Sequence, residues 1–149
     1  QRVVGMHFFN PAHIMKLVEV VKGEQTSEAV AKAIYDLCLQ MNKTPVMCKD
    51  APGFIVNRVA RHYYLEAMKL VETGVTGIEN VDDIMEATGF KKGPFRLMDL
   101  IGNDINLAVS QSLYEASGFA ERFRPSPLQQ QKVADGELGK KTGKGYYSY

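Results

Sequence analysis

The pattern of apolar residues changes near residue 50, and this change limits the folds that the chain can adopt. Before it, short apolar runs rich in β-branched residues flank one helical stretch, which predicts the order β, β, α, β. After Pro52, apolar residues recur at helical spacing. We therefore expect a mainly α protein with an α/β region over residues 1–50 and an all-helical domain over residues 51–149.

The α/β region is expected to contain three strands and one helix. In chain order these are buried strands over residues 2–9 and 16–23, a helix over residues 26–43 and a strand that begins at residue 44. Thr26 or Ser27 can cap the helix. Its apolar stripe is predicted to comprise Ala29, Val30, Ala33, Ile34, Leu37 and Cys38.

The helical domain is expected to hold four helices, over residues 53–74, 80–89, 93–118 and 126–136, with a Gly- and Lys-rich tail behind them. Gly102 can break or kink the third of these helices. The first helix has apolar groups on two sides, so it is either the central helix of a bundle or a helix that also packs on a partner subunit. Its main apolar arc is predicted to comprise Val56, Val59, Ala60, Tyr63, Ala67, Leu70 and Val71, with Phe54, Leu65 and Met68 outside it.

Charge and composition exclude several classes of function. The formal net charge of +1 provides no electrostatic basis for binding nucleic acid or a membrane surface. The apolar runs are much shorter than a membrane span requires. Cys38 and Cys48 have no metal-ligand spacing, and we interpret them as reduced thiols of a cytoplasmic protein. His13 and His62 lack ligand-spaced partners, so no metal site is expected.

Two ionisable residues, His7 and Glu19, interrupt apolar runs that otherwise look buried. A carboxylate there is costly unless it is paired or faces water at a sheet edge, and an isolated histidine is usually a satisfied core residue. If the two runs pair as a hairpin, however, His7 can lie opposite Glu19. A carboxylate beside an imidazole fixes its tautomer and stabilises the imidazolium, which suits a base that removes a hydroxyl proton.

Asn57 is the third candidate, one turn into the long predicted helix. Its amide can donate to a carbonyl and accept from a hydroxyl, although an ordinary surface asparagine would look the same.

The sequence does not match three other motifs of catalytic or nucleotide-binding sites. The tail stretch "GELGKKTGKG" does not fit the phosphate-loop pattern, and no Gly-x-Gly-x-x-Gly occurs. No Ser or Cys has a nucleophile-elbow context.

Four blocks, "GMHFFNPAHIMKLVEVV", "KDAPGFIVNR", "GPFRLMDLIGND" and "LGKKTGKGYYSY", together resemble the L-3-hydroxyacyl-CoA dehydrogenase family in order and separation. The resemblance covers essentially the whole chain. It implies a Rossmann-type NAD domain followed by a helical domain that mediates homodimerisation. By this resemblance the chain looks like a C-terminal portion, with residues 1–50 as the last β/α elements of the NAD domain and residues 51–149 as the helical domain.

The resemblance also implies roles for individual residues. His7 matches the catalytic base, Glu19 its paired carboxylate and Asn57 an active-site amide that contacts the substrate. Asn10 and Lys141 match positions that contact the NAD cofactor. The implied reaction is the reversible oxidation of a 3-hydroxyacyl-CoA to a 3-oxoacyl-CoA, with NAD+ accepting the hydride.

Several alternatives remain open at this point. The stretch "FIVNRVARHYYLEA" also resembles members that act on 3-hydroxyadipyl-CoA, so the acyl group is not defined. Because the dinucleotide fingerprint is absent from these residues, the chain by itself is expected to be an inert helical dimerisation module. A relative that acts on a non-CoA hydroxy acid, or a crystallin-like structural relative, is a further alternative, although the combined presence of His7, Glu19 and Asn57 argues against loss of activity.

Overall fold

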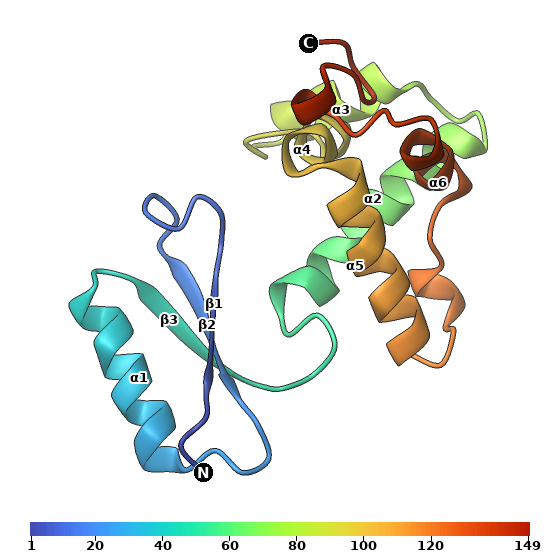
Figure 1. Cartoon of the computed structure of the whole chain (residues 1–149). Coiled ribbons are helices and arrows are strands. Elements are labelled where there is room, and N and C mark those ends of the chain that lie inside the picture. Colours follow the sequence, from blue (N-terminus) through green and yellow to red (C-terminus); the bar gives the residue numbers. More distant parts are fainter. The chain divides into compact units, whose positions relative to one another are not determined.

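The computed structural model describes residues 1–149, which form two compact units, residues 1–56 and residues 57–149 (Figure 1). We describe each unit by itself. The first contains β1 (Gly5–Phe8), β2 (Leu17–Lys22), α1 (Glu28–Gln40) and β3 (Thr44–Lys49). Helix α2 (Val56–Glu72) begins at the last residue of the first unit. The second unit continues with α3 (Ile78–Ala87), α4 (Pro94–Ile101), α5 (Asn103–Ala116), η1 (Glu121–Phe123), α6 (Pro127–Ala134) and η2 (Lys140–Thr142).

The first unit is a three-stranded sheet in the order β1-β2-β3. The element order β, β, α, β is as the sequence predicts. Strands β1 and β2 pair antiparallel, and β2 and β3 pair parallel through the crossover helix α1. Helix α1 packs on one face of the sheet (Figure 1). Its Cys38 forms a buried cluster with Val18 and Val20 of β2. The prediction that the first strand is buried was wrong. Strand β1 is partly exposed because it is an edge strand.

Helix α1 begins after Ser27, whose hydroxyl accepts a hydrogen bond from the backbone N–H of Val30 at 3.3 Å. The predicted apolar stripe was wrong in part, because Ala29, Ala33 and Leu37 are exposed. The buried positions are Ala31 and Cys38, which are seven residues apart and therefore share one helix face. Periodicity located the helix correctly but did not choose between its two neighbouring apolar faces.

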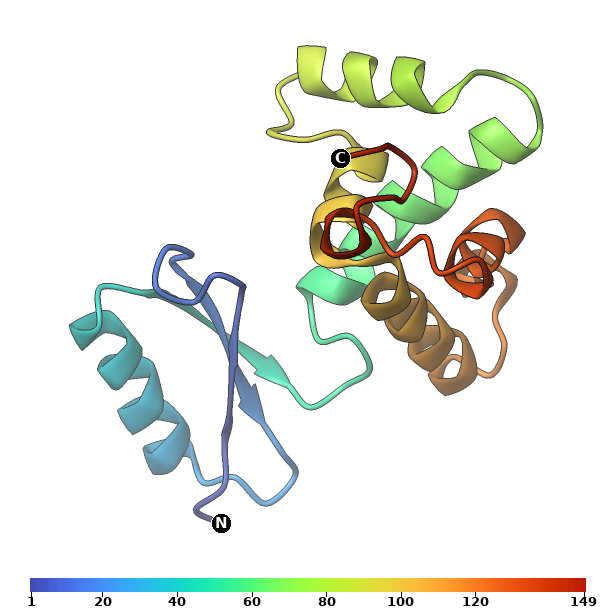
Figure 2. The ribbon, with the colours of Figure 1, turned by 45° about the horizontal axis from the view of Figure 1, so that its top comes forward.

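Helix α2 is the central helix of the second unit (Figure 2). Its buried face differs from the predicted arc. Val59 and Leu70 are exposed by 69% and 40%, whereas Leu65 and Met68, predicted to lie outside the arc, are buried. Tertiary packing decides which face is buried, because the residues that cover α2 pack against the side of the helix that carries Leu65. The core cluster consists of Tyr64, Leu65, Ala67, Met68, Val81, Phe95 and Met98.

Glycines end three of the helical segments where the sequence indicates. Gly74 and Gly89 follow α2 and α3 with φ values of 72° and 108°. Gly102, with φ 106°, separates α4 from α5, so the predicted segment 93–118 is two helices rather than one. These positive φ values are accessible to glycine at little cost. No helix of the protein combines the length and the apolar character that crossing a membrane requires.

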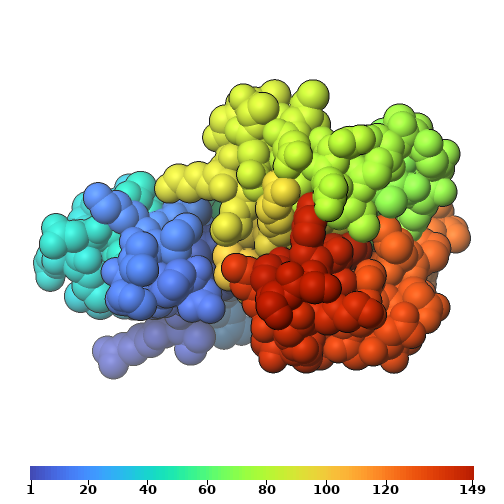
Figure 3. Space-filling model, turned by 90° about the horizontal axis from the view of Figure 1, so that it is seen from above, coloured from blue at the N-terminus to red at the C-terminus, as the bar shows by residue number.

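The buried carboxylate of Asp99 on α4 holds the C-terminal segment. Figure 3 shows this segment, in red, at the surface of the helical unit. One or other oxygen of Asp99 accepts hydrogen bonds from the backbone N–H groups of Tyr146 and Tyr147, both at 2.9 Å. The hydroxyl of Tyr149 and the amide of Asn103 also donate to it, at 3.1 and 3.0 Å. Four donors compensate for the burial of this charge. The sequence did not signal this role for Asp99.

A second buried carboxylate, that of Asp82 on α3, ties the same segment to the start of α4. It accepts the backbone N–H groups of Phe95 and Arg96 at 2.9 Å and the hydroxyl of Tyr147 at 2.8 Å. Burial and this hydrogen bond raise the pKa of Tyr147 above its ordinary value. Asp82 acts as a helix cap supplied from another helix, because α4 has only Gly93 at its own N-cap.

Gly145→Ala is expected to destabilise the helical unit by about 1–3 kcal/mol, because an added Cβ would overlap the carboxylate of Asp99 and displace the tail. Urea denaturation of the whole protein, followed by far-UV circular dichroism, measures the change. Gly77→Ala is the matched control: a Cβ there meets nothing, and the expected cost is under about 1 kcal/mol. Equal losses of stability in the two variants would contradict the role given to Asp99.

Candidate active site

His7 and Glu19 face each other on paired strands of the first unit. They are direct partners in the antiparallel register of β1 and β2, as the hairpin interpretation predicts. The imidazole Nδ1 lies 2.7 Å from Oε2 of Glu19. The Glu19 side chain is 1% exposed, whereas 32% of the His7 side chain remains accessible. The alternative of a glutamate that faces water at a sheet edge was therefore wrong, because β2 is the central strand.

The carboxylate of Glu19 also holds the start of helix α2. Its Oε1 accepts the backbone N–H of Ile55 at 3.0 Å and that of Val56 at 2.9 Å. The first N–H groups of a helix have no partner within the helix, and their positive end favours an anion. Glu19 thus has three donors, one from His7 and two from the backbone. This arrangement accounts for a carboxylate buried in an apolar strand.

A tight turn before α2 brings these N–H groups to Glu19. Gly53 and Phe54 both have positive φ, at 71° and 44°, and the N–H of Phe54 donates to the carbonyl of Ala51 at 2.9 Å. Such a conformation is unusual for phenylalanine, and backbone strain of this kind gathers at functional sites. The turn places the ring of Phe54 5.4 Å from the imidazole of His7, between ring centroids.

These contacts orient the imidazole of His7. The ring of Phe9, directly after β1, also contacts it, at a centroid distance of 4.8 Å. Because the carboxylate of Glu19 only accepts, Nδ1 must be the donor in their hydrogen bond, and Nε2 then carries the lone pair. Nε2 makes no hydrogen bond within the chain. The geometry therefore presents a free, basic nitrogen on an oriented ring, which is the requirement for a general base.

The other predicted site residues lie at surface or partly exposed positions. Asn57 is the second residue of α2, in its first turn, because the helix begins at Val56 rather than at Gly53 as expected. Its side chain is partly buried and makes no hydrogen bond within the chain. Asn10 is exposed in the loop after β1 and likewise keeps its amide free. Their predicted roles stay predictions.

Lys141 belongs to η2 in the helical unit, where its ammonium group contacts Asp104. The two carboxylate oxygens lie 2.6 and 2.7 Å from Nζ. This hydrogen bond holds the pKa of Asp104 below its ordinary value. Both side chains are about 40% exposed, so the ion pair adds little stability and can open to another anion.

Sequence reasoning missed the part played by Phe54 and by the N–H groups of Ile55 and Val56. The Pro52-Gly53 pair signals a turn before the helix. It does not signal which acceptor the helix start will find, because Glu19 precedes Ile55 by 36 residues.

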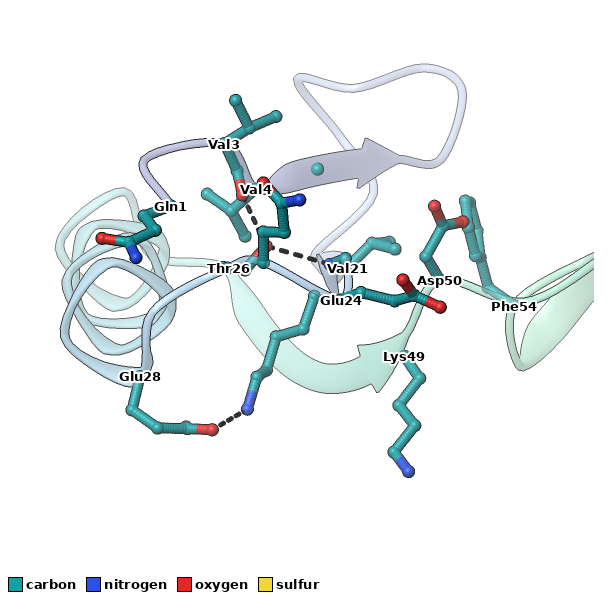
Figure 4. A pocket seen from close by; sticks show the side chains of 14 residues that line it. Gln1, Val3, Val4, Val21, Glu24, Thr26, Glu28, Lys49, Asp50 and Phe54 are labelled. Atoms are coloured by element: carbon teal, nitrogen blue, oxygen red, sulfur yellow. Dashed lines mark hydrogen bonds and ion pairs between the residues drawn. The ribbon is translucent and has the colours of Figure 1, made fainter.

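A separate hollow in the first unit shares only Phe54 with this constellation (Figure 4). It lies around the first residues of the chain and the β2–α1 connection. There the hydroxyl of Thr26 donates to the carbonyl of Val3 at 2.6 Å. Its charged lining mixes Glu24 and Asp50 with Lys49. Because the hollow contains neither His7 nor Glu19, we assign it no catalytic chemistry.

The chain matches two adjoining family models. Residues 1–51 match the model described as "3-hydroxyacyl-CoA dehydrogenase, NAD binding domain". Residues 53–149 match the model described as "3-hydroxyacyl-CoA dehydrogenase, C-terminal domain".

Individual proteins show the same likeness. A 3-hydroxyadipyl-CoA dehydrogenase of Escherichia coli is 49% identical over 100% of the chain and 32% of its own length. The mitochondrial hydroxyacyl-coenzyme A dehydrogenase of Mus musculus is 43% identical over 99% of the chain and 48% of its own length. A crystal structure of 3-hydroxybutyryl-CoA dehydrogenase from Escherichia coli, 49% identical, superposes with a TM-score of 0.94 over 97% of the chain and 31% of that structure. The chain thus spans about a third to a half of the length of these proteins.

Proposed function

This chain belongs to the 3-hydroxyacyl-CoA dehydrogenase family, and from that premise we propose that the whole protein oxidises an L-3-hydroxyacyl-CoA to the 3-oxoacyl-CoA with NAD+. One observation carries the proposal: the imidazole of His7 is oriented by the buried carboxylate of Glu19 and keeps Nε2 free. A base held in this way suits removal of a proton from a substrate hydroxyl.

In the proposed mechanism His7 is the general base. Its Nε2 takes the proton of the 3-hydroxyl group while the hydride leaves C3. Glu19 keeps the hydrogen on Nδ1 and offsets the positive charge that the ring gains. Bound NAD+ supplies the hydride acceptor. The aromatic rings of Phe9 and Phe54 hold the imidazole plane and shield one part of it from water.

Three further residues have proposed binding roles. Asn57 orients the oxygens of the substrate through its free amide. Asn10 and Lys141 contact the NAD cofactor, since the amide of Asn10 is exposed and unbonded, and the exposed pair of Lys141 with Asp104 can exchange one anion for another. We further propose that residues 1–50 end an NAD domain and that residues 51–149 form the helical domain. The compactness of residues 1–56 and 57–149 supports this division.

We propose that the helical domain mediates homodimerisation. Its support is a group of apolar side chains at the junction of α4 and α5 that remain about half exposed. Leu100, Ile101 and Ile105 are exposed by 50%, 39% and 52%. Light scattering of the whole protein measures its oligomeric state.

Both cysteines are unpaired, which supports a cytoplasmic location. Residues 1–149 alone are expected to show no turnover.

The direct test is steady-state formation of NADH by the whole protein with 3-hydroxybutyryl-CoA and with 3-hydroxyadipyl-CoA. We expect saturable turnover with at least one of these esters. The free hydroxy acids without coenzyme A are the control, and we expect them to react much more slowly. Faster turnover of a free hydroxy acid would reject the proposed substrate class, and absence of turnover with all compounds would reject the function.

A further inference from the structure

Two guanidinium groups and an imidazole of the helical unit gather around one aromatic ring. The Cζ atoms of Arg58 and Arg122 lie 5.4 and 4.7 Å from the ring centroid of Phe123. The imidazole of His62 stacks on the same ring at a centroid distance of 5.2 Å. Phe123 is 1% exposed, whereas both arginines are exposed and His62 is partly exposed. The ring therefore attracts these groups and keeps them together at the surface of the unit.

Rigid elements of the unit present the three groups. Arg58 and His62 are four residues apart in α2, so they lie on one face of that helix. Arg122 belongs to η1 and directly precedes Phe123, whose burial anchors this short turn. All four residues belong to the compact unit of residues 57–149, so the cluster does not depend on how residues 1–56 are placed.

Arg61 adds a buried positive charge on the next turn of α2, three residues beyond Arg58. Within the chain its Nη1 donates only to neutral oxygens, those of Asn106 and the hydroxyl of Ser110. Its Nε is buried and has no hydrogen-bond partner. Burial lowers the pKa of Arg61 to about 10, so the group is still charged at neutral pH.

These arginines lack the partners that other arginines of the unit have. Arg96 and Arg124 each bind a carboxylate side chain. No carboxylate lies within ion-pair distance of Arg58, Arg61 or Arg122. Like charges held this close repel one another. A bound anion would remove this repulsion and would give the exposed guanidinium groups an acceptor.

We propose that Arg58, His62 and Arg122 form a binding site for a phosphate group, supplied either as the free anion or as the phosphate of a small monoester. The guanidinium fork matches phosphate because it donates two parallel hydrogen bonds to the oxygens. A phosphate group presents three strong acceptor oxygens and close to two negative charges, whereas a carboxylate presents two oxygens and one charge. Three convergent donors with Arg61 behind them therefore favour phosphate. The buried Arg61 contributes its charge without contacting the ligand.

The test measures binding of inorganic phosphate to the whole protein at constant pH and ionic strength. The ring resonances of His62 report on the site, and those of His13, exposed in the other unit, are the internal control. We expect the His62 resonances to shift and saturate during the titration while those of His13 stay in place. Calorimetry should give the same Kd.

Glycerol 3-phosphate, titrated in the same way, distinguishes the two sources of the phosphate group. Tighter binding of the ester would identify a monoester as the ligand, and equal or tighter binding of inorganic phosphate would identify the free anion. Either order supports the site.

Arg122→Gln is expected to raise the Kd of inorganic phosphate about 10- to 100-fold, as loss of a charge-assisted hydrogen bond does. Arg122→Lys keeps the positive charge and is expected to lose less affinity. Arg58→Gln tests the second guanidinium and should weaken binding by a similar factor. Both arginines are exposed, so we expect these variants to fold, and circular dichroism checks this.

Arg124→Gln is the matched control, because Arg124 is exposed and close in sequence but is bound to Glu121. Its Kd for phosphate is expected to stay within twofold of the wild type. The inference is overturned if Arg122→Gln also stays within twofold, or if Arg124→Gln loses as much affinity. His62 resonances that do not saturate, or that saturate equally well with chloride, would overturn it too. No turnover is measured, so these outcomes leave the proposed dehydrogenase function untouched.

Discussion

His7→Gln is expected to lower kcat of the whole protein about 10²–10⁴-fold, because the variant loses the only free basic nitrogen that the Glu19 carboxylate orients. Glutamine can still donate a hydrogen bond to Glu19, so β1 and β2 should remain paired. The expected change in KM is small if the proton is transferred in the rate-limiting step. Steady-state NADH formation at saturating substrate measures the effect.

The matched control for this variant is His13→Gln. His13 lies exposed in the loop between β1 and β2 and is not part of the proposed site. Its kcat is expected to stay within twofold of the wild type. Turnover of His7→Gln within threefold of the wild type would remove His7 from the mechanism, and unchanged circular dichroism spectra would show that both variants are folded.

Glu19→Gln is expected to lower kcat by about 10²–10⁴-fold as well, but for a different reason. The amide oxygen can still accept the N–H groups of Ile55 and Val56. Its NH₂ group then faces Nδ1 of His7, which must become an acceptor, so the hydrogen moves to Nε2. The imidazole is still present, but it is held in the tautomer that cannot take a proton at Nε2.

Two measurements separate this tautomer effect from simple loss of structure. The ¹⁵N chemical shifts of the His7 ring should report the hydrogen on Nδ1 in the wild type and on Nε2 in Glu19→Gln. Glu19→Ala removes the acceptor of both backbone N–H groups and should lower the stability by about 1–3 kcal/mol relative to Glu19→Gln. Glu28→Gln, at an exposed position on α1, is the control. An unchanged tautomer in Glu19→Gln would contradict the orienting role.

Sequence patterns predicted the elements of this protein well because those elements depend on nearby residues. The helices end at Gly74 and Gly89, and the chain breaks at Gly102, since glycine tolerates the positive φ that each position requires. The pairing of His7 with Glu19 was one of the interpretations that the sequence left open, because a hairpin of the two strands can place them opposite each other; the structure shows the register that does so. The roles of Asn10 and Lys141 rest on family resemblance, and that of Asn57 rests on its amide and on the same resemblance.

Burial was predicted less well. Val59 looked like a core residue and is exposed, whereas Leu65 looked peripheral and is buried. Both lie in a helix with apolar groups on two sides, and the sequence of that helix does not say which side its neighbours will cover. The buried carboxylates of Asp82 and Asp99 were likewise unforeseen, since each binds donors from segments distant in the chain.

The sequence alone determined where the main strands and helices form and where several helices end, and it offered a hairpin pairing of His7 with Glu19 as one interpretation. These features follow from interactions between residues that are close along the chain or in direct register. The tertiary structure alone decided that the Glu19 carboxylate also receives the first N–H groups of α2, and that the Asp99 carboxylate receives N–H groups of the C-terminal segment. The physical reason is that a hydrogen-bond acceptor or a counter-charge is supplied by whatever folding brings near, and sequence spacing carries no record of it.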